Sequence, residues 1–371
     1  MAGLTSRERL TLPLLAALTA LAGAANYGAW AAVPRFALAT LALAGLAWVV
    51  SFATEALGER FGPGVTGMLQ STLGNLPELF VVVFALKKAE LVVAQTAIIG
   101  SILANALLVL GLVIVVGARR APDGLMRFSK RLPRDTATLL QVTVFIIVLL
   151  GLSLAAHDPA SHHVKGISVV GAICLLVVYL AWVVPYLRAD TVPGAGEAAG
   201  DSGERTAAVA GAPLAAPGPR LSLALTLVLL IAAGAASAFV SEWFVAGLEP
   251  AISQLHISQA FAGLVIVAIA GNAVENAAGL SLAWRRRSDL AISVVKNSVA
   301  QIAAFLFPLL VLVSFALPTT LTFALAPVYI GALALTALAL WQVTGDGQAA
   351  EFEGWALVAL YVILATLTLY E

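Results

Sequence analysis

The stretches Gly271-Asn272-Ala273-Val274-Glu275-Asn276 and Gly74-Asn75-Leu76-Pro77-Glu78 share one pattern. Each places an Asn and a Glu three residues apart, which puts both side chains on one face of a helix. Each also lies inside an apolar run long enough to span a bilayer. Because a charged side chain at mid-membrane costs at least about 2.5 to 3.5 kcal/mol, the two carboxylates indicate a functional site. We therefore expect one site built by two halves of the chain.

The composition is that of a polytopic helical membrane protein. The 371 residues are 61% hydrophobic and 11% charged, with a mean hydropathy of +0.99, and this is far more apolar than a soluble domain. A formal net charge of zero gives no indication of a nucleic-acid partner. The single cysteine, Cys174, excludes an intrachain disulfide and a cysteine metal site.

Eleven apolar runs are long enough for a transmembrane helix of about 20 residues. They are residues 10–32, 35–57, 64–87, 91–117, 134–155, 164–187, 220–243, 258–285, 289–315, 321–342 and 353–370. The first run follows Arg7 and Arg9, but it is longer than the apolar region of about 7 to 15 residues in a signal peptide. We therefore expect it to remain as a span.

The two signatures fall in the third and eighth spans, which run in opposite directions because five spans separate them. This predicts an inverted repeat of two five-helix halves, residues 34–188 and 220–371, with residues 1–33 as an additional N-terminal helix. Residues 189–219 are rich in Gly, Ala and Pro, and we expect a flexible cytoplasmic linker there. Most of the 20 Lys and Arg residues lie on the side of the N-terminus. The positive-inside rule then predicts a cytoplasmic N-terminus and an external C-terminus.

The residues around the two signatures can supply oxygen ligands to a cation. Ser101 and Asn105 share a helix face, as do Asn297 and Gln301. Pro77 and the glycines predict irregular helices with freed carbonyl oxygens, which a membrane tolerates only where a cavity or an ion satisfies them. Carboxylates and neutral oxygens without thiolate or His suit a hard cation, and favour Ca2+ over transition metals and Mg2+. The same glutamates take up protons when no cation is present, because burial disfavours their charged form.

Four motifs in order resemble the paired signatures of the calcium/proton exchangers in the cation/calcium exchanger superfamily. They are Gly74-Asn75-x-x-Glu78, Gly100-Ser101-x-x-x-Asn105, Gly271-Asn272-x-x-Glu275 and Gln301-Ile302-Ala303, and the resemblance covers nearly the whole chain. It implies a secondary antiporter, not an enzyme, in a bacterial-type inner or plasma membrane. Such a protein exports Ca2+ from the cytoplasm in exchange for H+ by alternating access, without a cofactor. The resemblance implies that Glu78 and Glu275 bind the cation or protons, in a site lined by Asn75, Asn272, Ser101, Asn105, Ser298 and Gln301.

Two residues depart from this family pattern and leave alternatives open. Asn276 stands where the family usually has His, and it cannot titrate near neutral pH, so Na+ or another cation is an alternative to H+. Lys296 enters a span near the site, where the family commonly has Gly-Ser-Ser before the Gln. Its ammonium either pairs with Glu275 or takes the place of a cation, or it snorkels toward the cytoplasmic end of the span.

Alternatives from other classes are a cation channel and a membrane enzyme. In a channel, the glutamate pair would form a selectivity ring. An enzyme is disfavoured, since the sequence contains no His-Glu-x-x-His and no Gly-x-Ser-x-Gly motif. His157, Asp158, His162 and His163 cluster in a predicted external loop, but their spacing matches no standard metal site. We expect a solvated loop there.

Overall fold

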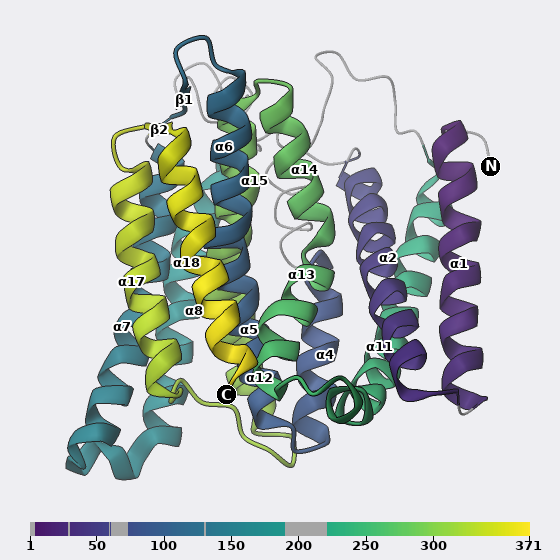
Figure 1. Ribbon diagram of the computed structural model, residues 1–371, viewed down its shortest axis with the longest axis horizontal. Coiled ribbons are helices and arrows are strands. Elements are labelled where there is room, and N and C mark those ends of the chain that lie inside the picture. Colours follow the sequence, from purple (N-terminus) through teal and green to yellow (C-terminus); the bar gives the residue numbers. More distant parts are fainter. Residues whose placement is uncertain (1–3, 29, 59, 61–72, 130, 190–220) are drawn as a thin grey trace. The chain divides into compact units, whose positions relative to one another are not determined.

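The fold is all-α and polytopic, as predicted. The computed structural model describes residues 4–28, 30–58, 60, 73–129, 131–189 and 221–371 (Figure 1). Among these residues, nine helices are long and apolar enough to cross a membrane, and the bent pair Gln259–Gly271 and Ala273–Trp284 raises the number to ten. Residues 64–72 of the predicted span 64–87 and residues 190–219 of the predicted linker lie outside the described residues.

The chain divides into two compact units. The first comprises Met1–Phe84, Trp182–Ile257 and Ala270–Val274. Its main helices are α1 (Ser6–Tyr27), α2 (Ala32–Gly58), most of α4 (Leu76–Lys87) and α11 (Leu223–Leu255). Helix α2 packs along α11, with the rings of Phe36 and Phe244 4.9 Å apart. Apolar side chains on the facing sides of both helices are buried, so this pair forms the core of the first unit.

The second unit comprises Ala85–Ala181, Ser258–Ile269 and Glu275–Glu371. A long helix runs through its interior as α5 (Leu91–Leu103), η1 (Ala104–Val109) and α6 (Leu110–Arg120). Its partner in the second half is α15 (Ser288–Gln301), η4 (Ile302–Leu306) and α16 (Phe307–Ser314). The remaining helices are α7 (Arg131–Ala156), η2 (Pro159–His163), α8 (Val164–Ala189), α12 (Gln259–Phe261), η3 (Ala262–Val267), α14 (Ala273–Trp284), α17 (Pro327–Thr344) and α18 (Glu351–Leu369).

Small residues allow close helix packing in this second unit. A Cβ atom added to Gly100 of α5 would lie 2.5 Å from the backbone Cα of Leu264 in η3. Gly111 of α6 and Gly354 of α18 face each other, and a Cβ on either would lie 2.6 Å from the other's carbonyl oxygen. Interfaces of small residues are typical of helices packed inside membranes, where backbones approach closely.

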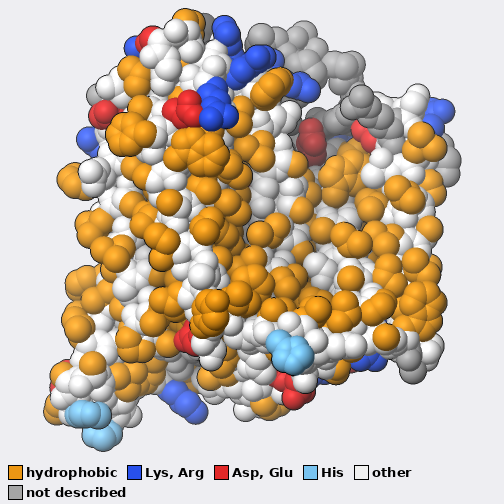
Figure 2. Space-filling model, viewed as in Figure 1, with side chains coloured by type: hydrophobic (Ala, Val, Ile, Leu, Met, Phe, Trp, Pro, Cys, Tyr) orange, Lys and Arg blue, Asp and Glu red, His pale blue; other side chains and the backbone are white. Residues whose placement is uncertain are grey.

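One end of the second unit carries many of its arginines. Strand β1 (Leu125–Arg127) pairs antiparallel with β2 (Gln348–Ala350), so the loops after α6 and before α18 meet at this end. Arg120 of α6 lies 4.4 Å over the ring of Trp284, which ends α14. Figure 2 shows Lys and Arg side chains gathered where β1 and β2 lie, and apolar side chains along the helices. These loops share one side, as the charge pattern predicts, and the cytoplasmic location of that side stays a prediction.

Two predicted spans have different bounds in the structure. Helix α17 begins at Pro327 rather than at residue 321. The preceding segment is irregular, and the Ala324 carbonyl accepts a hydrogen bond from the Gln95 side chain at 3.0 Å. Proline favours the first position of a helix, so the apolar residues before it extend the hydropathy signal but not the helix. Helix α11 continues to Leu255 rather than ending at residue 243.

Candidate functional site: two broken helices with buried polar residues

Each signature has a turn directly before a helix. Gly74 and Asn75 form a turn directly before α4, and Asn272 separates Gly271 from α14, with a bend of 60° between the helices on either side. Pro77 is the second residue of α4, where its missing N–H costs no intrahelical hydrogen bond. The predicted irregularity around Gly271 is confirmed. At Gly74 the described residues show a turn before α4, and residues 61–72 ahead of it lie outside the described part of the chain.

In the first unit, Glu78 lies against the second signature. A Cβ atom added to Gly271 would lie 2.6 Å from Oε1 of Glu78 and 2.8 Å from its carboxyl carbon. Glu78, Asn75 and Asn272 are all buried, with 4%, 5% and 0% of their surfaces exposed. Glu78 is in the first turn of α4, where the positive end of the helix dipole favours a carboxylate. Residues from the two signatures are therefore brought together around one carboxylate.

In the second unit, Asn105 links the motifs that follow the two signatures. Its Nδ2 donates hydrogen bonds to Oγ of Ser298 at 3.1 Å and to the Ser101 carbonyl oxygen at 3.0 Å. Ser101, Asn105 and Ser298 are buried, on α5, η1 and α15 respectively. Three of the predicted lining residues are thus in one polar cluster between two apolar helices.

A π-helical segment contains part of this cluster in the first half and follows it closely in the second. Segment η1 begins at Ala104, and η4 begins at Ile302, directly after the half-buried Gln301. Such segments occur mostly as single wide turns inside α-helices and frequently at functional sites. Their recurrence at corresponding places supports the predicted repeat, and it shows a helix irregularity that sequence periodicity did not reveal.

The second signature also supplies oxygen acceptors in the second unit. Glu275 is in the first turn of α14, followed by Asn276. The Oδ1 atoms of Asn276 and of Asn297 are buried and accept no hydrogen bond within the described part of the chain. Asn297 was not among the predicted lining residues, although its spacing from Gln301 on the same helix face indicated it. Both amide oxygens have the chemistry of ligands for a hard cation.

Lys296 is among the most buried large side chains, with 1% of its surface exposed. Its Nζ donates a hydrogen bond to Oγ1 of Thr344, the last residue of α17. The carbonyl end of a helix favours a cation, and the end of α17 adjoins the arginine-rich loops through β2. The ammonium is thus directed to the end of the span, as in the snorkelling alternative, but it stays buried against Thr344, which is 1% exposed, and does not reach water.

The His-rich loop between α7 and α8 is ordered by hydrogen bonds of Asp158. Its Oδ1 accepts from Oγ of Ser153 at 2.6 Å and from the Ala160 N–H at 2.8 Å, which caps η2. The hydrogen bond from Ser153 lowers the pKa of Asp158 below its usual value. Within the described ranges, no group of three His, Cys, Asp or Glu side chains is placed to hold a metal ion.

Buried polar residues beside turns in apolar helices define a multi-span membrane protein with a polar interior. Comparison with known families shows to which family of membrane proteins the chain belongs. A family model described as "Sodium/calcium exchanger protein" matches residues 32–186 and 225–370. The chain therefore belongs to the sodium/calcium exchanger protein family, whose members are transporters.

Relatives and solved structures that resemble the chain include named calcium/proton antiporters. The chain is 30% identical to the Ca(2+)/H(+) antiporter of Synechocystis sp., with 98% of this chain and 97% of that protein covered. It is 28% identical to the Ca(2+)/H(+) antiporter ChaA of Bacillus subtilis, with 91% and 92% covered. The structure of native YfkE matches with a TM-score of 0.77 at 26% identity, covering 97% of this chain and 100% of that one. The H+/Ca2+ exchanger CAX has the same fold, with a TM-score of 0.72 at 16% identity, covering 98% and 93%. The predicted resemblance to calcium/proton exchangers is confirmed.

Proposed function

We propose that this protein is a secondary antiporter that exports Ca2+ from the cytoplasm in exchange for H+ by alternating access. The observation that carries the proposal is the buried carboxylate of Glu78 against Gly271 at a break between helices. Burial disfavours the charged form of a carboxylate, so a cation or a proton bound there lowers the cost of burying it. The names of the relatives from Synechocystis and Bacillus subtilis support Ca2+ and H+ as the two substrates.

Glu78 and Glu275 are the proposed carriers of the cation or of protons. Two carboxylates match the charge of Ca2+, and neutral oxygens complete the six to eight ligands that it usually takes. Asn75, Asn272, Ser101, Asn105, Ser298 and Gln301 are the proposed sources of those oxygens. Ca2+ and protons compete for the same carboxylates. A site that holds neither Ca2+ nor protons carries uncompensated charge and is too costly to move across the membrane. Binding of one ion is therefore coupled to release of the other.

The proposed location is a bacterial-type inner or plasma membrane, with the N-terminus in the cytoplasm. The arginines at the ends of α6 and α14 and in β1 support this orientation, because cytoplasmic loops carry an excess of Lys and Arg. A proton gradient directed into the cell would then drive Ca2+ outward.

Ca2+ flux into proteoliposomes under an imposed pH gradient tests the proposal. We expect saturable uptake that requires the gradient and is abolished by Glu78→Gln or by Glu275→Gln. Glu249→Gln is a matched control, because Glu249 is an exposed residue of α11 outside both signatures. Uptake that neither saturates nor depends on the gradient would instead identify a channel. Equal loss in Glu249→Gln would contradict a specific role for the two signature glutamates.

Na+-coupled exchange is a second candidate, and the side chain of Asn276 favours it. Its buried amide oxygen, which accepts no hydrogen bond within the described residues, can ligate a cation but cannot release a proton. Ca2+ uptake driven by a Na+ gradient at uniform pH would support this candidate. In that case we expect Asn276→His to introduce dependence on the pH gradient, since His titrates near neutral pH.

A further inference from the structure

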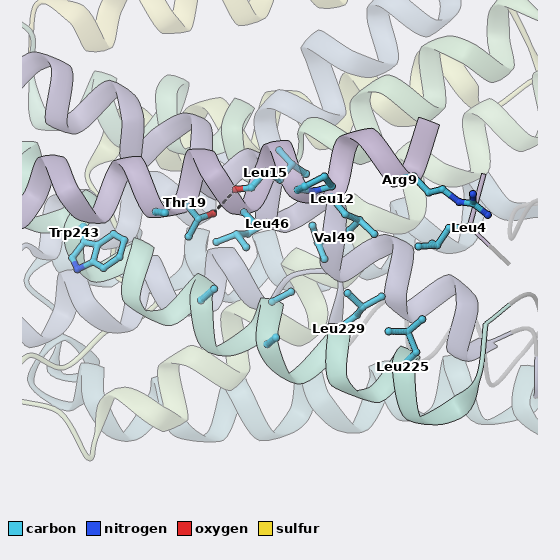
Figure 3. Close-up of a pocket in the computed structure, with 16 residues that line it drawn as sticks. Leu4, Arg9, Leu12, Leu15, Thr19, Leu46, Val49, Leu225, Leu229 and Trp243 are labelled. Carbon is cyan, nitrogen blue, oxygen red and sulfur yellow. Dashed lines mark hydrogen bonds between the residues drawn. The ribbon is translucent and has the colours of Figure 1, made fainter. Parts of the chain in front are cut away.

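A cavity of about 750 Å³ lies in the first unit between α1, α2 and α11. Figure 3 shows side chains of α1 directed toward α11 across it, with Leu4 and Arg9 at one end and Trp243 at the other. The cavity belongs to neither signature. It is formed by the additional N-terminal helix, α1, against the α2–α11 pair.

The cavity is long enough for an extended acyl chain. Leu225 and Trp243 both line it, and they are separated by about 27 Å along α11 at 1.5 Å per residue. The hydrocarbon core of a bilayer is about 30 Å thick and is filled by the chains of two leaflets. One lipid chain therefore needs about half of that length, and the cavity can contain it entirely.

The walls of the cavity are apolar and rich in small side chains. Leu12, Leu46 and Leu229 line it, together with alanines such as Ala16 and Ala232. Thr19 also lines it, but its hydroxyl donates to the Leu15 carbonyl oxygen at 2.8 Å, so this hydroxyl proton is not directed at a ligand. Such walls suit a hydrocarbon chain.

The two ends of the cavity differ. Trp243 closes one end, because its ring lies against Gly23, where an added Cβ would be 2.9 Å away, and edge-to-face against Tyr27 at 5.8 Å. The other end lies at the start of α1, where Arg9 is the charged residue among the described lining side chains and is exposed. An arginine at the membrane surface attracts the phosphate of an anionic lipid.

We propose that this cavity binds one acyl chain of an anionic phospholipid from the leaflet on the N-terminal side, with Arg9 at the phosphate of its headgroup. The bound chain fills the space between α1 and the α2–α11 pair. The site is independent of the cation-binding residues, so it stands whether or not the protein exchanges Ca2+ for H+.

Native mass spectrometry of the full chain in mild detergent tests the proposal. The probe is an equimolar mixture of phosphatidylglycerol and phosphatidylcholine with the same acyl chains. We expect one retained lipid, with phosphatidylglycerol preferred about fivefold, since one arginine near the surface contributes about that factor. Arg9→Gln should abolish the preference but not the retention, whereas Arg134→Gln, at an exposed arginine of α7, should leave both unchanged.

A second pair of variants tests the cavity itself. Ala232 lines the cavity and is exposed, so Ala232→Phe should fill it and reduce retention of both lipids by at least about fivefold. Ala235→Phe is the matched control, because Ala235 is exposed on the same helix outside the lining. Equal retention in Ala232→Phe and Ala235→Phe would overturn the proposal. A dimer mass that Ala232→Phe removes would also overturn it, because a second copy would then be the occupant.

Discussion

Glu78 of α4 and Gly271 at the end of α13 (Ala268–Gly271) are in such close contact that no side chain fits between them. A Cβ atom on Gly271 would lie 2.6 Å from the Glu78 carboxylate, well inside van der Waals contact. The glycine of the second signature thus makes room for the glutamate of the first. This relationship explains why a glycine precedes the Asn in the second signature, independently of any flexibility at the break.

Gly271→Ala is expected to displace the Glu78 carboxylate and to weaken Ca2+ binding about 10- to 100-fold, the usual effect of disturbing a group that positions a metal ligand. Ca2+ titration of the purified protein measures this loss. Gly234→Ala is the control, because its Cβ would meet only Leu76 at an ordinary 3.7 Å. That variant should bind Ca2+ normally and unfold at the same or a higher temperature, since Ala is favoured over Gly in a helix. An unchanged affinity for Ca2+ in Gly271→Ala would show that Glu78 does not bind the cation.

The hydrogen bond between Asn105 and Ser298 predicts an energetic coupling between the two halves. In a double-mutant cycle of Asn105→Ala and Ser298→Ala, we expect a coupling of about 0.6 kcal/mol and at most about 1.7 kcal/mol in the free energy of unfolding, the range for such bonds in membranes. If both residues also ligate the cation, each substitution raises the Ca2+ concentration for half-maximal uptake. A change in stability without that change in uptake would restrict the pair to a structural role.

The sequence was sufficient to predict the class of fold and the places where helices break. Long apolar runs marked the spans, Gly74 marked the turn before α4, and Gly271 marked the break before α14, because glycine weakens a helix locally. The predicted positions of the end of α11 and of the start of α17 were wrong. Hydropathy measures how apolar a segment is and not whether it is helical. The three π-helical segments among the described residues, η1, η3 and η4, were missed, because a single wide turn leaves the average periodicity unchanged.

The candidate site was predictable in its residue types but not in its contacts. Glu78, Asn105 and Ser298 were recognisable as polar residues in apolar spans, where polarity has a cost. The contact of Lys296 with Thr344 was not predictable, because Thr344 looks like an ordinary residue at the end of another span. Only the packing of α15 and α17 on the same helix, α7, brings the two side chains together.

Gly100→Ala is expected to destabilise the second unit. The added Cβ would lie 2.5 Å from both Cα and O of Leu264, and backbone atoms cannot rotate away as a side chain can. We expect a loss of at least about 1 to 3 kcal/mol, as for overpacked cores, measured as a lower midpoint of thermal unfolding. Gly166→Ala, whose Cβ would meet nothing within 4 Å, should change stability by no more than about 0.5 kcal/mol. An equally stable Gly100→Ala variant would show that α5 and η3 do not pack as described.

The pair Lys296 and Thr344 gives a prediction that separates two of the interpretations of this lysine: an ammonium directed to the end of α17, and an ammonium that takes the place of a cation. Thr344→Val removes an acceptor from a buried ammonium and should cost about 1.5 to 3 kcal/mol, as for hydrogen bonds to charged groups. Thr366→Val is the control, because Thr366 is exposed and, like Thr344, bonds the carbonyl four residues before it. Lys296→Met should be neutral or stabilising, since apolar residues often replace buried charges at no cost.

In the Lys296→Met background, Thr344→Val should therefore cost little, because no ammonium remains to lose its acceptor. If Lys296 is directed to the end of α17, Lys296→Met leaves the Ca2+ dependence of proteoliposome uptake unchanged. If its ammonium instead takes the place of a cation, the same substitution increases the apparent affinity for Ca2+, because a competing positive charge is removed. Uptake and unfolding are measured in Thr344→Val, in Lys296→Met and in the double variant. We expect the Ca2+ dependence of uptake to stay unchanged in Lys296→Met, because Nζ of Lys296 donates to Thr344.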